Sequence, residues 1–189
     1  MIRIGILGDI GSGKSYIAKN FGYPVFNADK EVGKLYKKNR KIFKKLQKAL
    51  PKHLFTFPVD KKEITKAILA NKTNLRKIIK IVHAEIRKKM NIFLRNNRDK
   101  KIIILDIPLL LENKINKKND ILIFVEASKK DIMKNLRLRD NFNLKMYKKF
   151  KKIQLSLDYK KKKSNFVIKN NFSSKSVQKK IGYIIKEIL

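Results

Sequence analysis

Apolar and polar positions follow two kinds of pattern along the 189-residue chain. Short and nearly continuous apolar runs, bounded by glycine, proline or polar residues, predict buried strands. These runs span residues 2–7, 24–27, 101–106, 120–126 and 166–169. Because a strand buried on both faces is apolar along its whole length, the runs favour a parallel sheet with helices on both faces.

Stretches with the apolar spacing of a helix separate these strands. They span residues 14–21, 128–139, 145–163 and the C-terminal end, where Ser173 or Ser174 is placed to cap a helix. The apolar stripe of that last helix consists of Val177, Ile181, Ile184, Ile185 and Ile188. Strands that alternate with helices predict an open α/β sheet that binds ligands at the carboxyl ends of its strands.

Residues 30–98 have a different character. They are helical in pattern, rich in lysine and interrupted near residues 51–58. One apolar helix face within them is formed by Ile78, Ile79, Val82, Ile86 and Met90. We therefore expect a single domain, residues 1–189, with a helical insertion at residues 30–98.

The segment between the first strand and the first helix carries the strongest chemical signal. It reads Gly8-Asp9-Ile10-Gly11-Ser12-Gly13-Lys14-Ser15 and matches the phosphate-binding pattern G-x-x-x-x-G-K-[ST] in full. Its glycines allow a turn whose N–H groups point at an anion, and the next helix adds its positive dipole end. Lys14 is expected to reach the β- and γ-phosphates of ATP, and Ser15 to bind Mg²⁺.

Asp9 is the unfavourable residue of this segment, because its carboxylate adds negative charge beside a phosphate site. Exposure to solvent is the expected way to reduce that cost. A glycine-rich turn that binds nothing is the alternative for the whole segment.

The charge of the chain adds a second hypothesis. Lys and Arg number 49 against 15 Asp and Glu, which gives a formal net charge of +34. Binding of nucleic acid is one explanation, and a codon bias that enriches lysine, asparagine and isoleucine together is the other. The charge is spread along the chain, which favours the second, and in either case it attracts anionic substrates such as nucleotides.

The remaining composition narrows the class of protein. Apolar residues make up 43% of the chain, enough for a packed core. The absence of cysteine excludes disulfides and thiolate metal sites and fits a reducing compartment. No secretory segment is visible, and the apolar run at residues 102–111 is too short to span a membrane. We therefore expect a cytoplasmic protein.

With the loop placed, the chain resembles bacterial dephospho-coenzyme A kinases nearly from end to end. After the loop, the most specific piece is Pro108-Leu109-Leu110-Leu111-Glu112-Asn113, which follows a predicted strand. The other pieces match by order and spacing: Phe26-Asn27-Ala28-Asp29, His83, Arg137–Asp140, Gln154 and Val167-Ile168-Lys169-Asn170-Asn171.

This resemblance implies a fold of the P-loop NTPase type, with an acceptor-binding helical insertion and a helical lid at about residues 137–163. It implies ATP-dependent phosphorylation of the ribose 3′-hydroxyl of dephospho-coenzyme A, with Mg²⁺, as the last step of coenzyme A synthesis. Dephospho-coenzyme A is then the partner, and neither a specific nucleic acid nor a membrane is expected.

The resemblance also implies catalytic roles. Asp29 matches the family's catalytic base, and a carboxylate just past a strand can orient the acceptor hydroxyl and take its proton. A helix cap is the alternative for Asp29. Arg137 and Arg139 match the lid that covers phosphate, and Arg139 aligns better because it precedes an Asp as in the family. Two solvated arginines are the alternative.

Other candidate residues carry weaker signals. Asp106 ends a strand as a Walker B carboxylate does, and it either holds Mg²⁺ through water or is an ordinary polar residue at a strand end. His83, Pro108 and Leu109 are candidates on the acceptor side. Tyr16, Asn170 and Asn171 are candidates beside the nucleotide. The lysines at residues 148–152 and 160–163 are expected to be solvated helix faces.

The family pattern is not complete in this chain. The first acid of its Asp-Ala-Asp motif is Asn27, its His-Pro is His83-Ala84, and a frequent lid arginine is Asn135. Two rival functions therefore stay open: another small P-loop kinase, acting on a nucleoside, nucleotide or shikimate-like acceptor, and a basic NTPase that binds nucleic acid.

Overall fold

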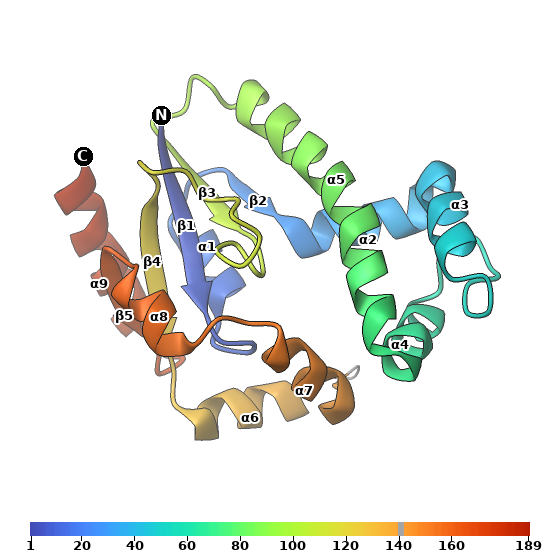
Figure 1. The fold of residues 1–189 in the computed structure, drawn as a ribbon. Coiled ribbons are helices and arrows are strands. Elements are labelled where there is room, and N and C mark those ends of the chain that lie inside the picture. Colours follow the sequence, from blue (N-terminus) through green and yellow to red (C-terminus); the bar gives the residue numbers. More distant parts are fainter. Residues whose placement is uncertain (140–141) are drawn as a thin grey trace. The chain divides into compact units, whose positions relative to one another are not determined.

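The computed structural model describes residues 1–139 and 142–189 and contains two compact units (Figure 1). The first unit comprises Met1–Asn27 and Asn97–Leu189, and the second comprises Ala28–Asn96.

Five parallel strands form the sheet of the first unit, in the order β2-β3-β1-β4-β5. Their bounds are β1 Ile2–Gly8, β2 Val25–Asn27, β3 Ile102–Asp106, β4 Ile121–Glu126 and β5 Phe166–Lys169. The structure thus confirms the predicted open parallel sheet. Its register sets Gly8 beside Val125 and Asn27 beside Asp106, so the polar residues that end β2 and β3 are neighbours.

Two helices build the core on one face of this sheet. They are α1 (Lys14–Asn20) and α9 (Ser174–Ile188), and they contact each other. The cluster that they form with the sheet includes Ile4, Ile6, Ile17, Phe21, Val177, Ile181 and Ile184. Ser173 stands at the cap position of α9, but its side chain makes no capping hydrogen bond.

Three further helices belong to the first unit: α6 (Lys129–Arg137), α7 (Leu144–Lys152) and α8 (Leu157–Lys162). The helix α8 contacts β1 and lies in front of the sheet in Figure 1, whereas α6 and α7 lie beyond the ends of the strands. The prediction of one helical stretch at residues 145–163 is wrong, because two helices, α7 and α8, occupy this segment. Ser156 caps α8 by accepting a hydrogen bond from the N–H of Tyr159 at 3.2 Å, so a new helix begins there.

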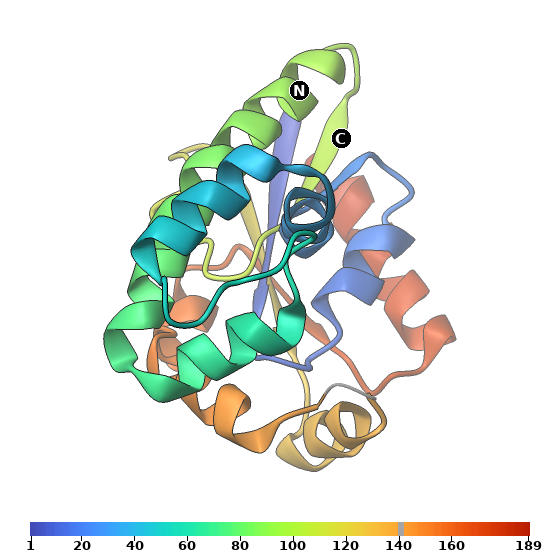
Figure 2. The same cartoon turned by 90° about the vertical axis from the view of Figure 1, so that its right-hand side faces the viewer.

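The second unit is entirely helical. Its helices are α2 (Ala28–Lys38), α3 (Arg40–Ala49), α4 (Lys61–Ala70) and α5 (Lys72–Asn96), drawn in blue to green in Figure 2. The helix α5 packs against the other three. Its buried positions include four of the five predicted apolar ones, Ile78, Val82, Ile86 and Met90, and Ile79 is half-buried. Among the residues described, no helix is long and apolar enough to cross a bilayer.

Candidate active site

The loop Gly8–Ser15 makes the predicted tight turn between β1 and α1. Gly13 has a φ of 90°, and a Cβ atom there would lie 2.3 Å from Asn170 Nδ2. Gly8 has a φ of 145°, and a Cβ atom there would lie 2.6 Å from the main-chain oxygen of Val125. Only glycine fits these two positions, because both the backbone angle and the space exclude a side chain.

Asn170 holds this loop from the end of β5. Its Nδ2 donates a hydrogen bond to the main-chain oxygen of Ser12 at 2.8 Å, and its Oδ1 accepts one from the N–H of Phe172 at 2.9 Å. Asn170 is 3% exposed, so this bond is protected from water. The side-chain amide that was a candidate for the nucleotide base therefore supports the loop, while its neighbour Asn171 is exposed.

The polar groups of the loop fit an anionic ligand. Lys14 Nζ donates to the main-chain oxygen of Asp9 at 2.6 Å and to that of Gly8 at 3.4 Å, which keeps the ammonium group at the loop. Ser12 is fully buried, and its Oγ has no hydrogen-bond partner among the described residues. A buried hydroxyl without a partner is costly, and a phosphate oxygen is an acceptor that it suits.

The expectation that Asp9 faces solvent is wrong. Asp9 is 5% exposed, and its Oδ1 accepts a hydrogen bond from the N–H of Ile10 at 2.7 Å. Its Oδ2 forms an ion pair with Lys151 Nζ of α7. The negative charge is offset by a lysine from a distant part of the sequence.

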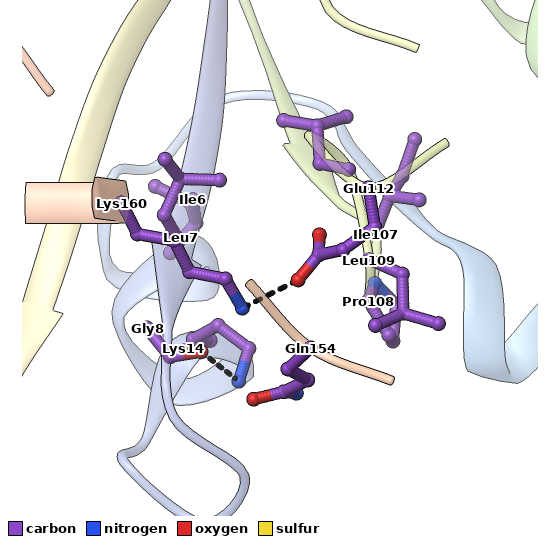
Figure 3. A pocket seen from close by; sticks show the side chains of 11 residues that line it. Ile6, Leu7, Gly8, Lys14, Ile107, Pro108, Leu109, Glu112, Gln154 and Lys160 are labelled. Atoms are coloured by element: carbon purple, nitrogen blue, oxygen red, sulfur yellow. Dashed lines mark hydrogen bonds and ion pairs between the residues drawn. The ribbon is translucent and has the colours of Figure 1, made fainter. Parts of the chain in front are cut away.

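A pocket lies beside the loop (Figure 3). Its lining includes Gly8, Lys14, Pro108, Leu109 and Gln154. Pro108 and Leu109, which follow β3, therefore lie in the same pocket wall as Lys14. The side-chain oxygen of Gln154 is buried and has no hydrogen-bond partner among the described residues, which makes it a further polar group on this wall.

A buried ion pair forms another part of the pocket wall. Lys160 Nζ of α8 lies 2.7 Å from Glu112 Oε1, and their side chains are 4% and 10% exposed (Figure 3). The same Oε1 accepts a hydrogen bond from the N–H of Leu155 at 3.0 Å. Glu112 thus joins the segment after β3 to the connection between α7 and α8. The prediction that the lysines at residues 160–163 form only a solvated face is wrong for Lys160.

The candidate metal ligands are Ser15, the second residue of α1, and Asp106, at the end of β3. Asp106 is 3% exposed and accepts a hydrogen bond from Asn27 Nδ2. Within the described part of the chain, no group of three or more His, Cys, Asp or Glu side chains could hold a metal ion. One hydroxyl and one carboxylate fit Mg²⁺, which usually takes few protein ligands beside water and substrate phosphates.

Arg137 ends α6, and Arg139 follows it; both are exposed. Their neighbour Leu136 is buried against the loop, because a Cβ atom on Gly11 would lie 2.8 Å from Leu136 Cγ. The helix end that carries the two arginines is therefore anchored at the loop. Asp140, which supports the alignment of Arg139, lies outside the described residues.

Two candidates belong to the second unit. Asp29 is exposed and is the second residue of α2, so it follows the first helical residue instead of preceding the helix as a cap would. His83 is half-buried in α5. Burial, and then the neighbouring positive charge of Arg87, lower the pKa of His83, which favours the neutral ring, a form that can both donate and accept hydrogen bonds.

Comparison with known proteins decides the family. The family model described as dephospho-CoA kinase matches residues 2–176. The chain belongs to the dephospho-CoA kinase family. A dephospho-CoA kinase from Wolbachia pipientis wMel is 30% identical over 191 residues, which cover 98% of this chain and 97% of the relative.

Solved structures agree with the fold of this family. The structure of TT1252 from Thermus thermophilus has a TM-score of 0.81 at 22% identity and covers 100% of this chain and 98% of its own. A dephospho-CoA kinase from Campylobacter jejuni has a TM-score of 0.61 at 25% identity, with coverages of 98% and 96%. The recognised fold and family are thus confirmed over nearly the whole chain.

Sequence reasoning missed Lys151 and Lys160, which act on the loop or its pocket from helices that are remote in sequence. It named Asn170 as a candidate beside the nucleotide, whereas in the structure this residue supports the loop. One weak signal for Lys160 was available in the sequence: the apolar Leu157 lies three residues before it, on the same face of a helix. Nothing in the sequence distinguishes Lys151 from the exposed Lys152 beside it.

Proposed function

We propose that the chain transfers the γ-phosphoryl group of ATP to the ribose 3′-hydroxyl of dephospho-CoA, the last step of coenzyme A synthesis. Membership of the dephospho-CoA kinase family supports the acceptor. The observation that carries the proposal is the glycine loop with Lys14 and a buried Ser12 hydroxyl, opening on a pocket that Pro108 and Leu109 also line.

The loop binds the triphosphate in this account. Main-chain N–H groups of the loop bind the β-phosphate, and Lys14 Nζ moves from the carbonyl oxygens of the loop to the β- and γ-phosphate oxygens. Ser15, with Asp106 through water, would hold Mg²⁺, which supplies positive charge to the phosphate oxygens. We assign Tyr16, Asn170 and Asn171 to the side of the nucleotide base, and Asn170 would act there by holding the loop.

Transfer requires that the acceptor hydroxyl is oriented and that positive charge stabilises the phosphoryl group as it moves. The 3′-hydroxyl oxygen attacks the γ-phosphorus in line with the bond that breaks, and ADP leaves. Asp29 accepts the proton of that hydroxyl. Arg139, or Arg137 beside it, donates to the γ-phosphate oxygens when residues 137–163 close over the nucleotide. Closure also excludes water, which would otherwise accept the phosphoryl group.

The helical unit, residues 28–96, takes the acceptor side in this proposal. Its lysines offer positive charge to the phosphates of dephospho-CoA, and the neutral ring of His83 offers a hydrogen bond to the same substrate. We further propose that the protein acts in the cytoplasm, where its substrates are made, and that the +34 charge serves anionic metabolites without a specific nucleic-acid target.

The acceptor can be tested with a panel. The purified protein is given ATP, Mg²⁺ and, one at a time, dephospho-CoA, adenosine, AMP, deoxyadenosine and shikimate, and products are identified by mass spectrometry and phosphorus NMR. We expect phosphate on the 3′-hydroxyl of dephospho-CoA and no product above background from the other acceptors. Turnover of another acceptor with none of dephospho-CoA would overturn the proposal.

A further inference from the structure

Asp9 presents an electrostatic problem that the proposed function has to solve. Its carboxylate is built into the loop that would bind the triphosphate, and it is 5% exposed. A buried negative charge next to an anion site opposes binding, and water screens it little. The N–H of Ile10 satisfies one carboxylate oxygen by a hydrogen bond but brings no positive charge.

The positive charge comes from Lys151. Its Nζ pairs with Oδ2 of Asp9 across 142 positions of sequence. The main-chain oxygen of the same Asp9 accepts hydrogen bonds from Lys14 Nζ at 2.6 Å and from the N–H of Ser12 at 3.2 Å. Asp9 is therefore bound on both sides, by the loop lysine at its main chain and by the α7 lysine at its side chain.

The pair also has a mechanical consequence. The helix α7 has no fully buried residue, and its apolar side chains Met146, Tyr147 and Phe150 are half-buried, so apolar packing fixes it less firmly than the core helices. It follows the segment that carries Arg137 and Arg139 and precedes Gln154 on the pocket wall. An ion pair from α7 to the loop therefore sets where this lid segment rests as well as the charge that the nucleotide meets.

We infer that Lys151 is a positioning residue for the nucleotide: it neutralises Asp9 and docks α7 on the loop, so the two residues act on ATP affinity as one unit. This inference rests on the proposed function only for the identity of the loop's ligand. The neighbouring lysine of α7, Lys152, is exposed and provides a control of equal charge.

The test is isothermal titration calorimetry with Mg²⁺ and a non-hydrolysable ATP analogue at physiological ionic strength. We expect Lys151→Met to weaken binding about tenfold, because Asp9 then faces the phosphates unpaired. Lys151→Arg should bind within about twofold of the wild type, since it keeps the charge, and so should Lys152→Met. The double variant Asp9→Asn/Lys151→Met should regain nearly all the loss, which shows that Lys151 acts through Asp9.

Two further measurements distinguish this role from a merely structural one. Thermal unfolding identifies any variant that has lost its fold, and the comparison then uses Lys151→Gln in place of Lys151→Met. In steady-state assays the loss should fall on KM for ATP, with KM for the acceptor unchanged. Equal losses in Lys151→Met and Lys152→Met, or a double variant as weak as Lys151→Met, would overturn the inference.

Tighter binding by Lys151→Met would also overturn it, because the pair would then oppose the nucleotide. Failure of the inference and failure of the proposed function can be told apart. The predicted binding pattern without turnover of dephospho-CoA supports the inference and contradicts the function alone. A wild-type protein that binds no nucleotide contradicts both.

Discussion

The phosphate loop and the arginine-bearing end of α6 contact each other through Gly11 and Leu136, but they are held in different ways. The loop is fixed by buried groups: Ser12 is fully buried, Asn170 is 3% exposed and Asp9 is 5% exposed. Arg137 and Arg139 are exposed, and only the leucine before them is buried. In the proposed mechanism, the first region is preorganised for the triphosphate, whereas the arginines reach the γ-phosphate only when the lid closes.

The largest expected effect tests the preorganised region. Lys14→Ala should lower turnover about 1,000-fold and leave the fold intact, because the proposed role of its ammonium group is to bind the phosphates, and its bonds to the main-chain oxygens of Gly8 and Asp9 lie at the loop. Lys19→Ala on the same helix removes an exposed lysine and should change turnover less than about twofold. Steady-state kinetics with circular dichroism measures both. Retained activity in Lys14→Ala would mean that the loop is not the phosphate site.

The buried ion pair beside the loop gives the next effect. Lys160→Met should destabilise the protein by about 3–5 kcal/mol, because it leaves the Glu112 carboxylate buried without a countercharge. Glu112→Gln/Lys160→Met should recover most of that loss, since the glutamine oxygen still accepts the N–H of Leu155. Urea unfolding measures each free energy. A single variant as stable as the wild type would show that this wall is not a rigid part of the site.

Gly13→Ala tests how tightly the loop backbone is fixed. The new Cβ would meet Asn170 Nδ2 at a φ that disfavours alanine, so we expect a loss of about 3 kcal/mol in stability, together with weaker nucleotide binding. Gly182→Ala in α9 is the matched control, because a Cβ there meets nothing within 4 Å. It should raise stability by about 0.5–1 kcal/mol through helix propensity. Equal behaviour of the two variants in thermal unfolding would contradict the argument from close approach.

Substitutions of the two exposed arginines test the second region. Arg139→Ala should lower kcat about 100-fold with little change in thermal stability, and Arg137→Ala should cost less than about fivefold. The assay is single-turnover transfer to dephospho-CoA, which isolates chemistry from product release. A larger loss of kcat in Arg137→Ala than in Arg139→Ala would assign the role to Arg137. If neither variant loses kcat, the arginines take no part in the transfer.

The contrast between the two regions also explains what the sequence could predict. The strands, their parallel arrangement and the loop could be predicted from local patterns, since apolar runs and glycine positions encode backbone geometry directly, whereas the order of the strands in the sheet was not predicted. Asp9, Lys151 and Lys160 were interpreted wrongly, because a lysine-rich helix has the same pattern whether one of its lysines faces water or a buried carboxylate. The break between α7 and α8 was missed although Ser156, a residue type that caps helices, was a local signal for it. The hydrogen bond from the N–H of Leu155 to Glu112, 43 positions away, could not be read from the sequence.

The most direct measurement is a crystal structure with a non-hydrolysable ATP analogue, Mg²⁺ and dephospho-CoA. The account predicts the triphosphate inside the loop, with Lys14 Nζ on the γ-phosphate, an arginine of residues 137–139 above it, and the carboxylate of Asp29 within hydrogen-bond distance of the ribose 3′-hydroxyl. A nucleotide bound elsewhere, or a 3′-hydroxyl out of reach of both Asp29 and the γ-phosphate, would contradict the central claim.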